Sequence, residues 1–255
     1  MKKTKDYHNY TDYDKEPCGL KKLDFVVEVI KERKKKDAII LDLGCGNANV
    51  SFPLAFMGYN VIGVDISEQL IKKNARKNKF KNLKFQVVDI NDIETYRSNF
   101  KSKFDIILCL DILEHLYDPP KLLKSVNHLS NSNGLLIVSI PNGYGFSELV
   151  SRIARNLEKI LKIQFINKFK RKTGRFSIQS ENYTPHVQKF TFTKFVRLVE
   201  QSGFKLIAYK NTTVFSSTLR WCNNPLEMFD CKLADRLPKS MVSGWCMAFE
   251  KVEDE

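Results

Sequence analysis

Two patterns of apolar positions alternate along the chain. Short runs of β-branched and other apolar residues are typical of buried strands, whereas apolar residues that recur every three or four positions are typical of amphipathic helices. Strands are predicted at residues 38–43, 60–64, 83–88, 104–110, 135–140, 204–209 and 243–251. Helices are predicted at residues 21–35, 50–57, 68–78, 120–129 and 193–202. Asp118 and Thr193 are the expected N-caps of the last two helices, and Gly203 is expected to end the second of them.

The alternation of strands and helices predicts the fold class. Strands that follow helices at this spacing are typical of right-handed βαβ units. We therefore expect an α/β fold: a Rossmann-like, seven-stranded and mostly parallel sheet with helices on both faces and insertions after the fifth and sixth strands. The expected parts are an N-terminal helical cap at 1–36, a core at 37–142, an insertion at 143–185, and the rest of the core at 186–255 with a second insertion at 216–240.

The stretch LDLGCGNANV joins the end of a predicted strand to two glycines and the start of a helix. Gly44 and Gly46 leave bare backbone where a bound nucleotide must approach closely. Asp65 stands at the end of the next predicted strand, where a carboxylate can accept hydrogen bonds from both hydroxyls of a ribose. This combination predicts a site for a nucleotide-like cofactor.

Two classes of cofactor, dinucleotides and S-adenosylmethionine, are compatible with these glycines. The dinucleotide fingerprint requires a third glycine, and this chain has Asn49 in its place. Asp42 favours a cationic cofactor, because a carboxylate would repel a pyrophosphate. After the third strand, Asp89 can bind the amine of an adenine, with Ile66 and Ile90 placed to enclose the ring. The sequence therefore favours S-adenosylmethionine.

A resemblance to a known family rests on these motifs taken together. Its motifs are DLGCG at 42–46, VDI at 64–66, DI at 89–90, LEHL at 113–116, IPNG at 140–143, and a block from His186 to Phe204. With them the chain resembles the class I S-adenosylmethionine-dependent methyltransferases, in particular the small-molecule enzymes related to the ubiquinone-biosynthesis O-methyltransferases. The likeness covers roughly residues 20–210. It departs from the family at Ala48, where the family's turn usually has a further glycine.

The resemblance implies S-adenosylmethionine as the cofactor and a set of residues that bind it. These residues lie at the ends of the first four predicted strands: Asp42, Gly44, Cys45, Gly46, Asp65, Ile66, Asp89, Ile90, Leu110 and Asp111. Structural alternatives remain open. The two glycines can serve the turn alone, Asp65 can cap the helix that begins at Glu68, and Asp89 can cap a turn.

Methyl transfer is an in-line displacement, so the enzyme must mainly align the acceptor and exclude water. A hydroxyl acceptor must also lose a proton, and a histidine suits the role of base. His115, just after the fourth strand, and His186, after the first insertion, are the candidate catalytic residues. His115 has an alternative role in lining the substrate site, and His186 can belong to a lid. The four histidines and six cysteines lack the spacing of metal ligands, so no metal site is expected.

Positive charge is concentrated in the first insertion. The chain carries a net charge of +13, and residues 147–183 contribute nine basic and three acidic side chains to it. Apolar residues on one face of a predicted helix, beginning at Leu149, oppose basic residues such as Arg152 and Lys159. Such a helix can be a lid over the substrate or a contact with a membrane surface through 147–172. Contact with nucleic acid is a third alternative, which the small number of aromatic residues in this segment favours less.

The second insertion is apolar and bears on the choice of acceptor. Phe215, Leu219, Trp221, Leu226, Met228 and Phe229 can wall an apolar acceptor pocket or mediate dimerisation. We therefore expect a methyltransferase that acts, most simply on oxygen, on a small apolar or lipid-linked acceptor. The alternatives are an RNA methyltransferase and a non-catalytic, membrane-associated protein that binds the cofactor.

The location of the protein in the cell follows from its cysteines and apolar runs. No apolar run is long enough for a spanning helix, and the N-terminus does not resemble a secretory signal. Unpaired cysteines in predicted core segments favour a reducing compartment. We expect a cytoplasmic protein, with peripheral contact at the membrane if the first insertion binds lipid.

Overall fold

In the computed structural model of the chain, the described residues are 6–12, 16–33, 37–93, 100, 103–145, 148–149, 187–215 and 224–252. They form one seven-stranded sheet in the order β3-β2-β1-β4-β5-β7-β6. The strands are β1 (Ile39–Leu43), β2 (Asn60–Asp65), β3 (Leu83–Val87), β4 (Phe104–Leu110), β5 (Ser130–Pro141), β6 (Phe204–Asn211) and β7 (Gly244–Lys251). The pairs among β1 to β5 are parallel, and β7 lies antiparallel between β5 and β6. The predicted fold class and all seven predicted strands are confirmed.

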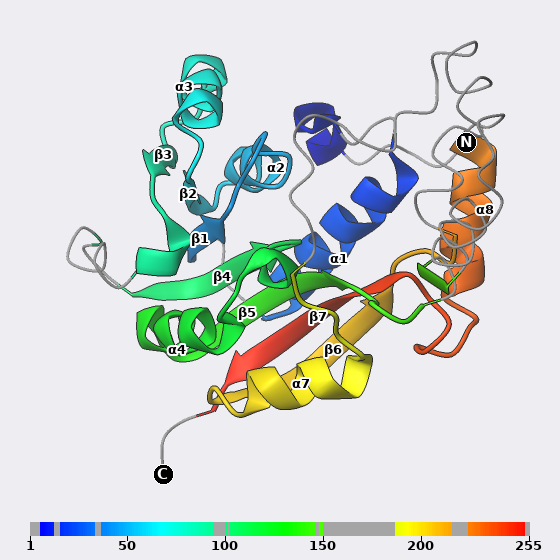
Figure 1. The fold of residues 1–255 in the computed structure, drawn as a ribbon. Helices are drawn as coiled ribbons and strands as arrows, with labels where there is room; N and C mark the ends of the chain where they lie inside the picture. Colours follow the sequence, from blue (N-terminus) through cyan, green and yellow to red (C-terminus); the bar gives the residue numbers. More distant parts are fainter. Residues whose placement is uncertain are drawn as a thin grey trace, which may run out of the picture.

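Helices cover both faces of the sheet (Figure 1). The helices are α1 (Pro17–Arg33), α2 (Ser51–Phe56), α3 (Glu68–Lys77), α4 (Pro119–Leu129), α7 (Phe192–Glu200) and α8 (Asn224–Ala234), with short 3-10 helices η1 (Asp6–Tyr10), η3 (Ile90–Asp92) and η5 (Leu113–His115). One apolar core joins α4 and α7 to one face of the sheet, and a second joins η1, α1 and α2 to the other. Because alternate residues of the central strands enter the two cores, these strands are apolar on both faces.

The start of α7 corrects one predicted helix boundary. The side chain of Thr191, not that of Thr193, caps this helix by accepting a hydrogen bond from the backbone N–H of Lys194 at 3.4 Å. The helix begins earlier because Phe192 is buried, with its ring against Tyr209 and Trp245. The cap predicted for α4 is confirmed, since Asp118 accepts a hydrogen bond from the N–H of Lys121.

The insertions are described only in part. Of residues 147–172, only 148 and 149 are among the described residues, so the predicted amphipathic helix lies outside them. Residues 224–240 of the second insertion are described, and α8 stands beside α1 beyond the carboxyl ends of the parallel strands (Figure 1). No helix in the described part of the chain is long and apolar enough to cross a membrane.

Candidate active site

The turn after β1 brings bare backbone to the carboxyl edge of the sheet. Gly44 and Gly46 have positive φ angles of 65° and 51°. A Cβ on Gly44 would lie 2.1 Å from Cδ1 of Ile112, whereas a Cβ on Gly46 would meet no atom closer than 4.0 Å. Gly44 is therefore required by the packing and the backbone, and Gly46 presents open space that a ligand can occupy.

The two departures from glycine in this turn have local explanations. Ala48 adopts a φ of 59°, a conformation that glycine adopts more readily, and its N–H donates to the carbonyl of Cys45 at 2.7 Å. Asn49 takes the third glycine position of a dinucleotide fingerprint, and its Oδ1 accepts a hydrogen bond from the N–H of Asp12 at 3.0 Å. The turn thus keeps its shape without further glycines, and the segment before α1 rests against it.

Asp65, at the end of β2, links this strand to the glycine turn that follows β1. Its carboxylate accepts one hydrogen bond from the N–H of Gly46 and one from the N–H of Ser67, both at 2.9 Å. Ser67, rather than Asp65, caps α3 by accepting from the N–H of Leu70. Asp65 is half-buried, and each carboxylate oxygen retains acceptor capacity for a ligand hydroxyl.

Asp42 is a buried carboxyl beneath the turn. It is 3% exposed and accepts a hydrogen bond of 2.6 Å from Oγ of Ser51. Burial raises its pKa to about 7, with the carboxylate of Asp65 adding to the effect. A cationic ligand nearby would favour the ionised form, so the site fits a cofactor that carries a sulfonium and an ammonium group.

The end of β3 supports the turn-capping alternative for Asp89. One oxygen of its carboxylate accepts hydrogen bonds from the backbone and side-chain nitrogens of Asn91, both at 2.9 Å, at the start of η3. Ile90 is half-buried against the core, whereas Ile66 is 66% exposed. Both isoleucines follow strand ends at the same edge of the sheet as Gly46, as the prediction requires.

At the end of β4, Asp111 lies in a polar cluster that includes the N-terminal helix. Its carboxylate forms an ion pair with Nζ of Lys22 from α1 and accepts a hydrogen bond of 2.8 Å from Oγ of Ser139. Partial loss of hydration disfavours both charges, yet the mutual attraction raises the pKa of Lys22 and lowers that of Asp111. Asp111 has a φ of 54°, an unusual conformation for a residue other than glycine. Leu110, just before it, packs against the second core.

A cavity of about 300 Å³ opens beside Asp111. Its polar lining comes from α1, β4, η5, α8 and the region between β6 and β7: Cys18, Lys22, Asp111, Glu114, His115, Thr212, Thr213, Glu227 and Ser243. Its apolar part consists mainly of Ile140, Pro141 and Trp245. The cavity therefore has three carboxyl groups and one ammonium group in its wall, at the strand edge that carries the turn.

Glu114 is the most buried of these carboxyl groups. It is 2% exposed, and its Oε2 has no hydrogen-bond partner within the described part of the chain. Burial, together with the negative charge of Asp111, raises its pKa to about 8. His115, the predicted base, also lines the cavity, and its Nε2 lies 3.8 Å from Oε1 of Glu114. His186, the other predicted base, lies outside the described residues.

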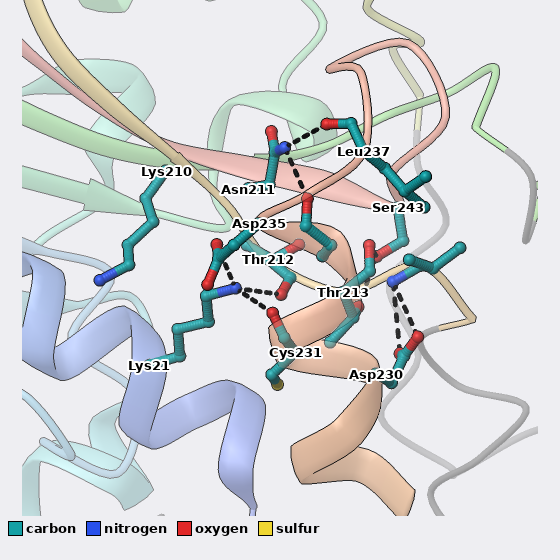
Figure 2. Close-up of polar contacts among 12 residues, drawn as sticks. Lys21, Lys210, Asn211, Thr212, Thr213, Asp230, Cys231, Asp235, Leu237 and Ser243 are labelled. Carbon is teal, nitrogen blue, oxygen red and sulfur yellow. Dashed lines mark hydrogen bonds and ion pairs between the residues drawn. The ribbon is translucent and has the colours of Figure 1, made fainter.

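Polar contacts fix α8 to the rest of the molecule (Figure 2). From α1, Lys21 donates to the carbonyl oxygens of Thr212 and Cys231 and pairs with Asp235, at 3.0, 2.6 and 2.8 Å. Asp230 accepts from the N–H groups of Val214 and Phe215 at 3.2 to 3.3 Å. These contacts hold in place the part of the cavity wall that contains Glu227 of α8.

The apolar residues of the second insertion do not form the expected pocket wall. Leu226, Met228 and Phe229 of α8 are 51%, 47% and 64% exposed and do not line the cavity. Phe215 is half-buried against the core, and Leu219 and Trp221 lie outside the described residues. The pocket-wall alternative was wrong for α8 because Glu227 and Asp230 face inward and accept hydrogen bonds from backbone N–H groups, and the dimerisation alternative stays a prediction.

Sequence reasoning missed Lys22 and Glu227, and it named Glu114 only as part of the LEHL motif, with no role of its own. Lys22 follows the pattern of an ordinary amphipathic helix, and only the tertiary structure brings it to β4. Glu114 directly precedes His115, which was chosen as the candidate base. Its place after Leu113, just beyond a predicted buried strand, was a usable signal that its carboxyl group is buried. Among the described residues, no group of three or more His, Cys, Asp and Glu is arranged to hold a metal ion.

Comparison with known proteins agrees with this geometry. A family model described as a methyltransferase domain matches residues 34–202. The ubiquinone biosynthesis O-methyltransferase of Coxiella burnetii (strain RSA 493 / Nine Mile phase I) is 37% identical over 105 residues, which are 40% of this chain and 43% of the relative. That of Pelagibacter ubique (strain HTCC1062) is 32% identical over 114 residues, 44% of this chain and 45% of the relative. The chain thus matches less than half the length of these curated relatives.

Solved structures share the fold at low sequence identity. A SAM-dependent methyltransferase from Methanosarcina mazei aligns with 89% of this chain and 98% of its own at 17% identity, with a TM-score of 0.58. Magnesium protoporphyrin IX methyltransferase from Synechocystis PCC 6803, solved with bound SAH, aligns with 92% of this chain and 84% of its own at 16% identity, with a TM-score of 0.55.

Proposed function

Because the chain belongs to the methyltransferase domain family, we propose that it transfers a methyl group from S-adenosylmethionine to a hydroxyl group of a small acceptor. The observation that carries the proposal is a cavity of about 300 Å³ beside the end of β4, at the same sheet edge as the glycine turn and Asp65. A cofactor site and an acceptor site that adjoin are the minimum that group transfer requires.

The cofactor supplies an electrophilic methyl group, and the residues at the strand ends supply its binding site. Gly44, Cys45 and Gly46 would hold it with backbone groups, and Asp65 would accept hydrogen bonds from its ribose. The buried carboxyl of Asp42 would balance its positive charge. At the remaining strand ends, the contacts would come from Ile66, Asp89, Ile90, Leu110 and Asp111.

The names of the curated relatives support oxygen as the methylated atom and a lipid-related acceptor. In this chain, the polar lining of the cavity suits the reacting hydroxyl. Ile140, Pro141 and Trp245 offer the apolar surface against which a hydrophobic remainder would pack. We therefore propose an amphiphilic acceptor, polar at its reacting end.

Calorimetry tests the cofactor. S-adenosylmethionine and S-adenosylhomocysteine should bind, and NAD should not. Asp65→Asn should weaken binding by roughly 10-fold to 100-fold, because hydrogen bonds to a charged group contribute about 1.5–3 kcal/mol. Asp92→Asn, at an exposed aspartate of η3, is the matched control and should leave affinity unchanged. Binding of NAD alone would contradict the proposal.

Isotope labelling tests the reaction. Cell extract incubated with the protein and a donor with a ¹³C-labelled methyl group should yield a labelled small molecule that contains a new methoxy group. Label recovered in RNA would favour the nucleic-acid alternative. Cofactor binding without any labelled product would favour the non-catalytic one.

A further inference from the structure

Glu227 of α8 brings a carboxylate to the wall of the cavity. The residue is only 7% exposed, and it lines the cavity. Its Oε1 accepts a hydrogen bond of 3.2 Å from the N–H of Cys18, whereas Oε2 has no hydrogen-bond or ion-pair partner among the described residues. Buried charges in proteins are normally paired, because their removal from water is costly. A cationic group on a ligand would therefore stabilise this carboxylate.

We propose that Glu227 and Thr212 bind a protonated amine of the acceptor, an inference that rests on the function proposed above. The acceptor then has two polar groups: a hydroxyl that receives the methyl group, and an ammonium group that fixes the orientation of the molecule. An ammonium group suits the two residues, because it carries a positive charge and three N–H donors, whereas a neutral hydroxyl donates only once.

The accessibility of Oε2 of Glu227 is the first argument. Within the described part of the chain, the side-chain atoms that are both sealed from solvent and without a partner belong to Asn74, Glu114 and Asn211. Glu227 is not among them, so its unpartnered oxygen retains accessible surface. Because Glu227 lines the cavity, a ligand in the cavity can reach this oxygen, in contrast to the sealed oxygen of Glu114.

The hydroxyl of Thr212, the residue that follows β6, is the second argument. Thr212 is 6% exposed and lines the cavity. Its N–H donates to the carbonyl of Gly244 and its carbonyl accepts from Lys21, both at 3.0 Å, but its hydroxyl has no hydrogen-bond partner among the residues described. Lys21 also donates to the carbonyl of Cys231, four residues after Glu227 on α8 (Figure 2). Thr212 therefore lies beside the same part of α8.

The other charged groups around the cavity are the third argument. Lys22 pairs with Asp111, and the neighbouring Lys21 pairs with the aspartate that follows α8. Neither lysine forms an ion pair with Glu227. Burial and the charge of Asp111 raise the pKa of Glu114 to about 8, so that carboxyl is largely protonated at neutral pH. Glu227 is thus the carboxylate in the cavity wall that remains for a cationic ligand.

The hydrogen bond from Cys18 gives Glu227 a structural role at the start of α1, which can be separated from ligand binding. In Glu227→Gln, the amide oxygen can still accept from the N–H of Cys18, but the side chain carries no charge. The stability of this variant in urea should stay close to that of wild type. Thr212→Val, which keeps the shape of the side chain and removes the hydroxyl, is a second variant that leaves Glu227 unchanged.

Three phenols that differ in one substituent test the amine site without any methyl transfer. Tyramine carries an ammonium group, para-ethylphenol carries no charge, and para-hydroxyphenylpropionate carries a carboxylate. Their binding can be followed by NMR from the indole N–H of Trp245, which lines the cavity and whose signal is identified by its loss in Trp245→Phe. Tyramine should bind at least about 10-fold more tightly than para-ethylphenol, because hydrogen bonds between charged groups are the strong ones. The propionate should bind most weakly, because its charge is repelled by Glu227.

The variants should remove this order of affinities. Glu227→Gln should weaken the binding of tyramine by about 10-fold and change that of para-ethylphenol by less than about twofold. Thr212→Val should weaken the binding of tyramine by about threefold, as expected for the loss of one hydrogen bond to a hydroxyl. Glu200→Gln, at an exposed glutamate of α7, is the matched control and should bind all three phenols like wild type.

The outcomes distinguish the amine site from the proposed function. The site is overturned if tyramine does not bind, if it binds no better than para-ethylphenol, or if its advantage persists in Glu227→Gln. Formation of the methyl ether from both phenols with equal kcat/KM would support the proposed function and overturn the amine site. Selective binding of tyramine, lost in Glu227→Gln, without methyl transfer to any acceptor would support the amine site and contradict the proposed function.

Discussion

Lys22 and Asp111, which are 89 residues apart in the sequence, form an ion pair at the wall of the cavity. The pair joins α1 to the end of β4. Because Lys22 also limits the proton affinity of Glu114, the N-terminal helix takes part in the electrostatics of the site as well as in its packing.

Removal of Lys22 should change both the stability of the protein and the pKa of Glu114. In Lys22→Met, Asp111 loses its partner, and we expect a loss of about 1–2 kcal/mol, less than for a fully buried pair because Asp111 is 45% exposed. The pKa of Glu114 should rise further. Urea unfolding measures the loss of stability, and an NMR titration of protein labelled with ¹³C at the glutamate carboxyl carbons measures the pKa. Lys72→Met, which breaks an exposed pair with Glu68 on α3, is the control, and an equal loss of stability there would contradict this prediction.

A methyl group on Gly44 should abolish cofactor binding. Gly44→Ala places a Cβ at 2.1 Å from Ile112 in a backbone conformation that costs a non-glycine residue roughly 1–2 kcal/mol. Gly58→Ala is a matched control: its φ of 95° is also positive, but a Cβ there would meet no atom within 4 Å. Both variants should unfold more easily than wild type, and only Gly44→Ala should lose affinity for S-adenosylhomocysteine in calorimetry. Equal affinities would show that the turn tolerates the change.

Asp42 should make stability depend on pH. Its pKa is raised from about 3.8 in the unfolded chain to about 7 in the folded one. Between these values the unfolded chain binds fewer protons, so the contribution of this group is complete below pH 4 and is lost as pH rises through 7. In Asp42→Asn, whose amide oxygen can still accept from Ser51, this decline should disappear. Denaturant unfolding from pH 4 to 8 measures the free energy of unfolding. If it falls with pH equally in wild type and Asp42→Asn, the decline does not come from Asp42.

Lys21 should be needed for the docking of α8. Lys21→Met removes two hydrogen bonds to carbonyl oxygens and the pair with Asp235, and should cost about 2–3 kcal/mol. Hydrogen exchange should rise first in α8. Lys210→Met, which breaks a longer contact of 3.6 Å with Glu28, is the comparison and should cost much less. Unchanged exchange in α8 after loss of Lys21 would mean that other contacts hold this helix.

The positions of the residues in the proposed cofactor site were predictable because their signals are local. The glycine turn and the acids at successive strand ends occupy fixed places in each βα unit, so the sequence spacing alone brings them to one edge of the sheet. The proposed acceptor cavity depends on pairs such as Lys22 with Asp111, and on the side of α8 that faces inward. The apolar residues of the second insertion gave a wrong prediction for the cavity wall. Glu227 and Asp230 face inward instead, because they accept hydrogen bonds from the backbone N–H groups of Cys18 and Val214.

The place of β7 between β5 and β6 has a consequence for how the protein is made. This strand is the last of the sheet in chain order yet occupies an interior position, so the edges of β5 and β6 that face it stay unpaired until residues 244–251 have been synthesised. The cavity wall at Trp245 and Gly244, which this strand begins, forms only at that point. A nascent chain can therefore form the turn after β1 early, but it cannot complete the wall of the cavity until β7 has been synthesised.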